Sequence, residues 1–260
     1  MNDIFDFGRF GKLFVYECRN YLPRYIKGLV VFAGFLVAAW MLSMSIGGVM
    51  PDRSGYIGVL YNFAIILSPY FIYKHINDRK RGYSYAMIPA STLEKLLSMT
   101  IVSFIVVPVT VYAALTFTDV VLYALSSIGI GRFTGIILYN PFEVFIEDFG
   151  APVGNVLLAT FATISTAVMF NSIFRKSKII KTVLFNMTAG FLLSLLAITL
   201  VQLTSQEFWE NMADRIGQFF RAYTYEEVIA LYNTLATLGH LLVICVTLAI
   251  TYYRIKKVNY

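Results

Sequence analysis

Charged residues are scarce in this sequence. Asp, Glu, Lys and Arg together make up 14% of its 260 residues, whereas a soluble globular domain carries about 25%. Hydrophobic residues account for 58%. This shortage of charge excludes a water-soluble domain of this size and indicates a membrane protein.

Cysteine and histidine are rarer still. The two cysteines, Cys18 and Cys245, do not suggest a disulfide framework, and the two histidines, His75 and His240, form no Cys/His cluster with metal-ligand spacing. A G-x-x-x-x-G-K-[ST] phosphate-binding loop is also missing. We therefore identify no catalytic constellation, and we expect no enzyme activity, cofactor or metal site in this chain.

The sequence has long uncharged runs instead. Six runs of 20 to 26 residues lie between charged residues, and a helix of about 20 residues crosses a hydrocarbon core of about 30 Å. We predict an all-α membrane protein with six transmembrane helices, an amino-terminal interfacial helix and short extracellular helices, in a single polytopic domain over residues 1–260. The predicted spans are about 28–50, 54–74, 92–118, 151–174, 180–205 and 226–254.

Basic residues are distributed unevenly between the two sides of these spans. Seventeen of the 21 Lys and Arg lie at the termini or in the second-to-third and fourth-to-fifth loops, and only Arg53, Arg132, Arg215 and Arg221 lie on the other side. Cytoplasmic loops are enriched in Lys and Arg, so both termini are predicted to be cytoplasmic. The net charge of +6 then reflects membrane topology, and it is not evidence for nucleic-acid binding.

Amphipathic segments flank the spans. Apolar residues recur at helical spacing within 4–27, which predicts a helix on the inner leaflet with a bend near Pro23; a plain extension of the first span is the alternative. On the outer side, the patterns predict a short helix at 141–149 and an amphipathic helix within 204–227. Thr224 and Glu227 form a capping-box motif at the start of the sixth span.

The most informative segment is "DRKRGYSYAMIPASTLEK", residues 78–95. Pro89 disfavours helix immediately before it, and Ser91 with Glu94 forms a capping-box motif, so the third span is predicted to begin near Thr92. Gly82 is expected to interrupt any helix that precedes it. An ordinary positively charged cytoplasmic loop is one reading, but a defined cap and two tyrosines favour a structured loop that docks a partner. The candidate contact residues are Asp78, Arg79, Lys80, Arg81, Tyr83, Tyr85 and Pro89.

The stretch "RGYSYAMIPASTLEKLLS" resembles the cytoplasmic loop of bacterial ABC transporter permeases of the type-2 export class. In that class a basic strip precedes a Leu-Pro-(Ala/Val)-Ser/Thr turn into the third span, and here Ile88 stands in place of the usual Leu. The predicted layout of an interfacial helix, six spans and cytoplasmic termini is also similar to that class.

The resemblance implies a function. The chain would be the permease subunit of an ATP-driven exporter in the bacterial inner membrane, moving an amphipathic, peptide or lipid-like substrate outward. The loop at 76–90 would couple it to a separate ABC-type ATPase subunit, which would bind ATP and Mg, and a second permease copy would complete a homo- or heterodimer among membrane lipids. The alternative is a non-transporting membrane sensor or assembly module that docks a cytoplasmic partner through the same loop.

Polar and helix-breaking residues within the spans are few. His240, in the sixth span, is a candidate intramembrane polar site, although a neutral histidine hydrogen-bonded to a neighbouring helix is the alternative. Pro69 and Pro108 are expected to kink the second and third spans.

Overall fold

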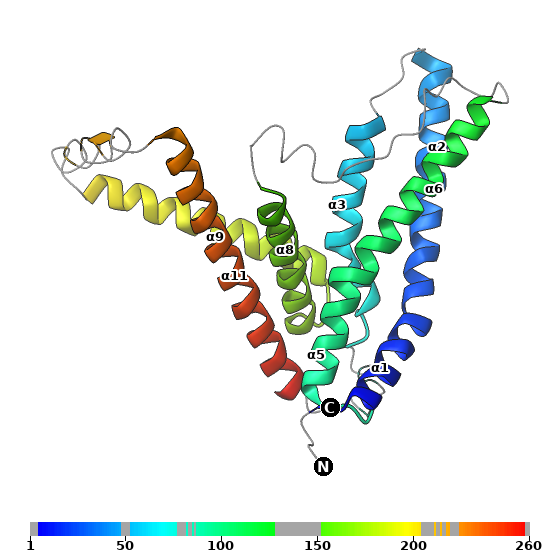
Figure 1. Ribbon diagram of the computed structural model, residues 1–260, viewed down its shortest axis with the longest axis horizontal. Coiled ribbons are helices and arrows are strands. Elements are labelled where there is room, and N and C mark those ends of the chain that lie inside the picture. Colours follow the sequence, from blue (N-terminus) through cyan, green and yellow to red (C-terminus); the bar gives the residue numbers. More distant parts are fainter. Residues whose placement is uncertain are drawn as a thin grey trace.

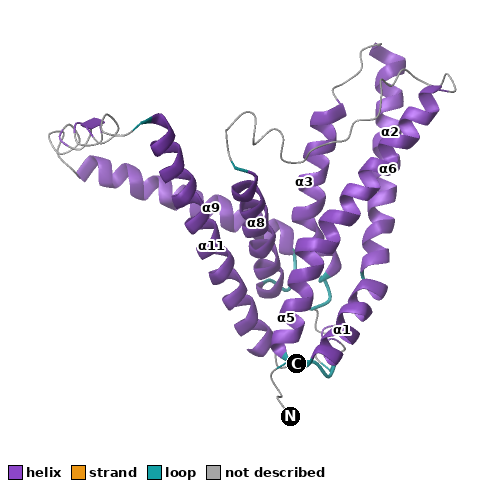
Figure 2. Cartoon of the chain, in the orientation of Figure 1, coloured by secondary structure: helices purple, strands orange, loops and turns teal. Residues whose placement is uncertain are grey.

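The computed structural model describes residues 5–47, 53–76, 82, 85, 87–127, 152–203, 211, 214, 217–218 and 224–257. Every regular element in these ranges is helical (Figure 2). The elements are α1 (Phe7–Asn20), α2 (Leu22–Gly47), α3 (Arg53–Ile72), α5 (Thr92–Ile101), the π-helix η1 (Val102–Val106), α6 (Val107–Ser127), α8 (Val153–Ile173), α9 (Lys178–Leu203) and α11 (Tyr225–Lys257).

Within the described residues, four helical segments are long and apolar enough to cross a membrane: Thr92–Leu125, Val153–Ile173, Lys178–Leu196 and Glu226–Lys257. A shorter apolar helix covers Leu60–Ile72. The described part of the chain is therefore all-helical, and its four long apolar helices indicate a membrane-embedded protein. The predicted spans at 28–50 and 54–74 fall on α2 and α3, and the total of six remains a prediction.

The predicted outer helices fall mostly on residues that the structure does not describe. The segment 141–149 lies entirely outside the described residues, and so does 204–223 apart from four helical positions at 211, 214, 217 and 218. The capping box at the start of α11 is present. The backbone N–H of Thr224 donates to Glu227 Oε2 at 2.8 Å, and that of Glu227 donates to Thr224 Oγ1 at 3.4 Å.

The amino-terminal segment forms two helices that meet at Tyr21. Helix α1 starts at a cap that the sequence did not lead us to expect, in which the Asp6 side chain accepts from the Arg9 N–H at 2.9 Å. Its last turn closes with the Tyr21 N–H donating to the Glu17 carbonyl at 2.9 Å. Pro23 lacks an N–H and cannot continue the hydrogen-bond ladder, so the break lies two residues before the position predicted for the bend.

Both membrane prolines are accommodated by local changes in hydrogen bonding. Pro69 leaves the Ile65 carbonyl without its helical donor, and the Ser68 hydroxyl donates to that carbonyl at 2.8 Å. Pro108 is the second residue after η1, and the Val107 N–H between them donates to the Val102 carbonyl five residues earlier. A proline ring clashes with the carbonyl four residues before it, and a wider π turn relieves such crowding.

The helices form two arms that join at one end (Figure 1). One arm contains α2, α3 and α6, which contact one another, and the other contains α8 packed along α11. At the joined end, α5 contacts both α1 and α11, so the first helix and the end of the last lie together there. The two termini are thus at the same end of the molecule.

Helices α8 and α11 form the most extensive helix pair and run parallel. Asn155 near the start of α8 donates to Asn233 of α11 at 3.2 Å, and Thr247, further along α11, donates to Ser165 at 2.9 Å. Because both helices run in the same direction, α9 between them has to carry the chain back. Its long axis crosses the others in Figure 1.

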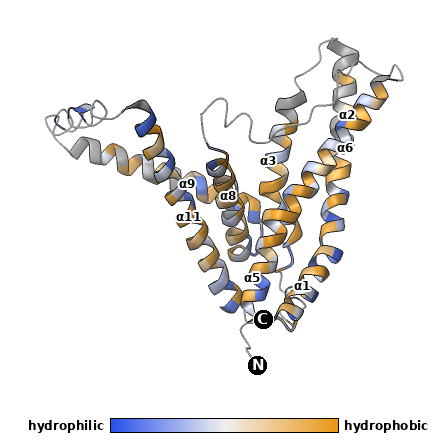
Figure 3. Ribbon diagram, viewed as in Figure 1, coloured by the Kyte–Doolittle hydropathy of each residue, from blue (hydrophilic) through white to orange (hydrophobic). Residues whose placement is uncertain are grey.

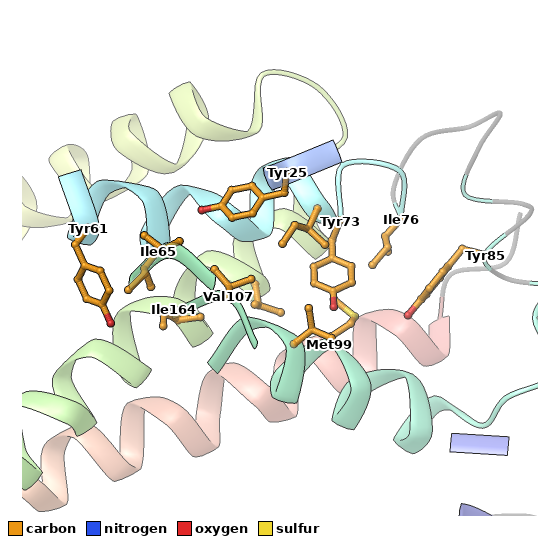
Figure 4. Close-up of a cluster of buried hydrophobic side chains, with 13 residues drawn as sticks. Tyr25, Tyr61, Ile65, Tyr73, Ile76, Tyr85, Met99, Val107 and Ile164 are labelled. Atoms are coloured by element: carbon orange, nitrogen blue, oxygen red, sulfur yellow. The ribbon is translucent and has the colours of Figure 1, made fainter. Parts of the chain in front are cut away.

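The core of buried side chains lies where α3, α5, η1 and α8 meet (Figure 4). It is rich in tyrosine, and the Tyr25 hydroxyl donates to the Ala64 carbonyl at 2.8 Å. Outside this core, large apolar side chains on α9 and α11 are exposed, for example Phe191 and Leu242. The helices are accordingly apolar over much of their length (Figure 3), as a lipid environment allows.

Candidate functional site

The loop before α5 is described only in part. Asp78, Arg79, Lys80, Arg81 and Tyr83, five of the predicted contact residues, lie outside the described residues. The other two differ in exposure. Tyr85 is buried, with 4% of its surface exposed, whereas Pro89 is exposed.

The end of this loop has an inner and an outer side. Ile88 packs against the core beside Tyr85, and its N–H donates to the Tyr85 carbonyl at 3.3 Å. Met87 points outward with 66% of its surface exposed, next to the exposed Pro89. Gly82 is itself helical and buried, but the residues directly before it lie outside the described residues, so its expected interruption of a preceding helix stays a prediction.

The predicted capping box at the start of α5 is present and has a second role. Glu94 Oε2 accepts from the Ser91 N–H at 2.8 Å, and the Ser91 hydroxyl accepts from the Glu94 N–H at 3.2 Å. Glu94 Oε1 accepts from the Asp6 N–H at 2.7 Å and from the Arg9 guanidinium at 3.0 Å. The cap residue therefore also fastens the start of α1 to the start of α5.

A second carboxylate, Glu17 of α1, lies deeper in the same junction. Only 1% of its surface is exposed. Its Oε2 accepts from the hydroxyls of Tyr73 at 3.0 Å and Ser98 at 2.8 Å, and its Oε1 accepts from the Tyr85 hydroxyl at 2.9 Å. We call these four residues the Glu17 cluster. It joins α1, the end of α3, the loop and α5.

The local sequence explains how these groups converge. Glu17 is four residues after the buried Leu13 and four before Tyr21, so it lies on the inward stripe of α1. Tyr73 begins the turn that follows α3, beside Met99 of α5 in Figure 4. The cluster is therefore built from an ordinary helical stripe, a helix end and a capped helix start.

Burial sets the protonation chemistry of the Glu17 cluster. Removal from water raises the pKa of Glu17 to about 7, and the hydroxyls of Ser98, Tyr85 and Tyr73 oppose that rise by donating to the carboxylate. Both protonation states are thus populated near neutral pH. Burial and the neighbouring Glu17 also raise the pKa of the Cys18 thiol.

Aromatic and basic groups surround the cluster. The His75 ring lies 4.2 Å from the Tyr21 ring and 5.3 Å from the Tyr85 ring, measured between centroids. The Lys95 ammonium lies 5.5 Å from the centroid of the Tyr85 ring. The loop tyrosine is therefore held by a hydrogen bond at its hydroxyl and by ring contacts along its side.

A separate junction fastens the turn between α8 and α9 to the end of α3. Asn171 donates to the carbonyls of Pro69 at 2.8 Å and Tyr73 at 3.1 Å. The Lys178 ammonium, with only 8% of the residue exposed, donates to Asn171 Oδ1 at 2.6 Å and to the Lys74 carbonyl at 3.1 Å. A cation at the carbonyl end of a helix is favourable, so Lys178 stabilises the end of α3.

Glu17 and Met87 were not among the residues predicted from the sequence. An acidic residue within the apolar stripe of α1 was the available signal for Glu17. Met87 carried no comparable signal, since one methionine in a loop is uninformative.

His240 lies on α11 between the residues that contact Asn155 and Ser165. It is partly buried, and its Nδ1 makes no hydrogen bond within the part of the chain that the structure describes. The described residues contain no group of three or more His, Cys, Asp or Glu side chains that could hold a metal ion.

Comparison of this chain with protein-family models, curated proteins and solved structures finds no match.

Proposed function

We propose that this chain is the permease subunit of an ATP-driven exporter in the bacterial inner membrane, with both termini cytoplasmic. Its loop at 76–90 would couple it to a separate ABC-type ATPase subunit that binds ATP and Mg. The observation that supports this most strongly is the hydrogen bond from Tyr85 to Glu17, because it builds the loop into the helix junction.

The described end of the loop suits a docking role. Met87 and Pro89 are exposed, and the basic stretch 79–81 precedes them in the sequence, so a partner of this loop would meet both apolar and positively charged residues. Inward residues of the same loop are anchored by Glu17 and by the core. A displacement of the exposed side of the loop by a partner would therefore also displace its buried side, which contacts Glu17 and the core.

The path from the loop into the membrane is short. Ser91 caps α5, and α5, η1 and α6 continue as one helical span over Thr92–Leu125. Movement of the loop would therefore displace the third span directly. Export of an amphipathic, peptide or lipid-like substrate would follow from paired movements in a dimer of two permease copies.

Charge and exposure are consistent with this placement. Helix α1, the loop at 76–90 and the end of α11 together contain nine of the 21 Lys and Arg, and α1 and α11 both contact α5 at the joined end of the two arms. The exposed apolar sides of α9 and α11 would face lipid or the second permease copy.

The test is affinity purification of the full-length chain from its native membranes in mild detergent, followed by mass spectrometry. We expect an ATPase with a Walker phosphate-binding loop to be recovered with it. The double variant Arg79→Glu/Lys80→Glu should reduce that recovery about tenfold, as expected from losing about 1.4 kcal/mol of binding free energy.

A matched control reverses one arginine and one lysine in the other loop on the same side, Arg175→Glu/Lys176→Glu. Both residues are exposed. Full recovery of a stimulated ATPase by the Arg79/Lys80 variant would rule out the coupling role. Recovery of a different partner in place of an ATPase would favour the non-transporting module.

A further inference from the structure

The three hydrogen bonds of the Glu17 cluster meet on one side chain of α1, while all three donors come from other elements. We infer that Glu17 is the positioning residue that holds the loop to the helix bundle, and that the hold is firm when Glu17 carries a proton and loosens when the proton is lost. The consequence for transport rests on the proposed function, but the hold itself does not.

The geometry gives Glu17 this role. Tyr85 brings the loop, Tyr73 the end of α3 and Ser98 the start of the third span, and each donates to the same carboxylate at 2.8 to 3.0 Å. Without the carboxylate, the hydroxyls of Tyr73, Tyr85 and Ser98 would all lose their hydrogen-bond acceptor. Loss of buried hydrogen-bond acceptors is costly, so the loop would lose its polar anchor.

The direction of the proton effect follows from burial. Burial in the closed cluster raises the pKa of Glu17 to about 7 from its ordinary value of 4.5. An acid whose pKa is higher in the closed state favours closure when protonated, so rising pH shifts the equilibrium toward opening between these values. Three donated hydrogen bonds reduce the cost of the buried charge without cancelling it.

Other titratable or charged groups face this junction and have to be separated from Glu17. They are Cys18 of α1, Tyr21 between α1 and α2, Arg24 of α2, Tyr73 and His75 after α3, Tyr85 of the loop and Lys95 of α5. Glu94 is engaged by Asp6, Arg9 and Ser91 instead. His75 is the principal competitor, because histidine ordinarily titrates near neutral pH.

The experiment is hydrogen exchange measured by mass spectrometry on the full-length chain in lipid nanodiscs, without any partner. Peptides that contain Tyr85 are followed at pH 6, 7 and 8, and each rate is divided by that of the unfolded chain at the same pH. We expect opening of the wild-type loop to increase about tenfold from pH 6 to pH 8.

Three variants distinguish the role of Glu17. Glu17→Gln should abolish the pH dependence and leave the loop at least about tenfold better protected than wild type at pH 8, since the neutral amide mimics the protonated acid. Glu17→Ala should lower protection at every pH, because the acceptor is gone. His75→Gln should retain the pH dependence, and Glu226→Gln, at an exposed glutamate of α11, serves as the control.

The inference would be overturned by a pH dependence that persists in Glu17→Gln, or by one that disappears in His75→Gln. Unchanged protection in Glu17→Ala would overturn it as well. Because no ATPase is present, this outcome is independent of the purification test. Hydrogen exchange can show that Glu17 holds the loop even if no ATPase is recovered. Equally, an ATPase can be recovered even if hydrogen exchange shows that Glu17 does not hold the loop.

Discussion

The Arg9 guanidinium and the Glu94 carboxylate lie 3.0 Å apart, and the same carboxylate oxygen also accepts from the Asp6 N–H at 2.7 Å. One side chain therefore caps α5 and fastens the start of α1. The Arg9 side chain is 38% exposed, whereas Glu94 is fully buried, so the two ends of this ion pair contribute unequally to stability.

Removing Glu94 should cost more stability than removing Arg9. Glu94→Ala leaves the backbone N–H groups of Asp6 and Ser91 without their acceptor. It should lower the free energy of unfolding by about 2 to 3 kcal/mol. Arg9→Ala removes a partly exposed partner and should cost at most about 1 kcal/mol. Thermal unfolding of the purified protein in detergent measures both, and equal losses would contradict this account.

Glu17 should make the protein less stable as pH rises. Its folded-state pKa of about 7 lies above the ordinary value of 4.5, so the folded state binds the proton more tightly and stability falls between these values. The total change is on the order of 3 kcal/mol. Melting temperatures measured from pH 5 to pH 8 should fall for wild type and fall less for Glu17→Gln. Parallel curves for the two proteins would contradict the assignment.

Lys178 should be a stabilising residue despite its position beside a loop. Lys178→Met removes the donor to Asn171 and to the Lys74 carbonyl, and should cost about 1.5 to 3 kcal/mol because hydrogen bonds to charged groups are lost. Lys176→Met, at an exposed position two residues earlier, is the matched control. Denaturant titration should separate the two variants, and equal midpoints would argue against the junction.

Met87 should affect partner binding without affecting stability. Because 66% of its surface is exposed, Met87→Asp should change the free energy of unfolding by less than about 0.5 kcal/mol. Under the proposed function it should nevertheless reduce ATPase recovery about tenfold, as for the loss of about 1.4 kcal/mol of binding. Met87→Leu keeps the apolar contact and should retain the ATPase. Retention by both variants would remove Met87 from the contact.

Helix positions were largely predictable because the signals for them are local. The uncharged run at 151–174 became α8 at Val153–Ile173, and the Ser91–Glu94 motif placed the start of α5 at Thr92 as predicted. A capping box depends on residues three positions apart, so no tertiary information is needed to find it. The same holds for Thr224 and Glu227.

The candidate site was much less predictable because its partners are distant in sequence. Glu17 accepts hydrogen bonds from residues 56, 68 and 81 positions away, and only helix packing brings these together. Lys178 shows the same limit. It was counted among the basic loop residues that indicate orientation, yet the structure buries it against α3.

The π turn η1 changes which neighbours the third span can reach. A π turn holds one more residue than an α turn, and one residue corresponds to about 100° of rotation about the helix axis. Side chains after Val106 therefore point to a different side than they would on an uninterrupted helix. Before this offset the span contacts α1 and α11 through α5, and after it the span contacts α2 and α3 through α6. Conversion of that turn to α geometry would twist the two halves of the span against each other by about a quarter of a revolution.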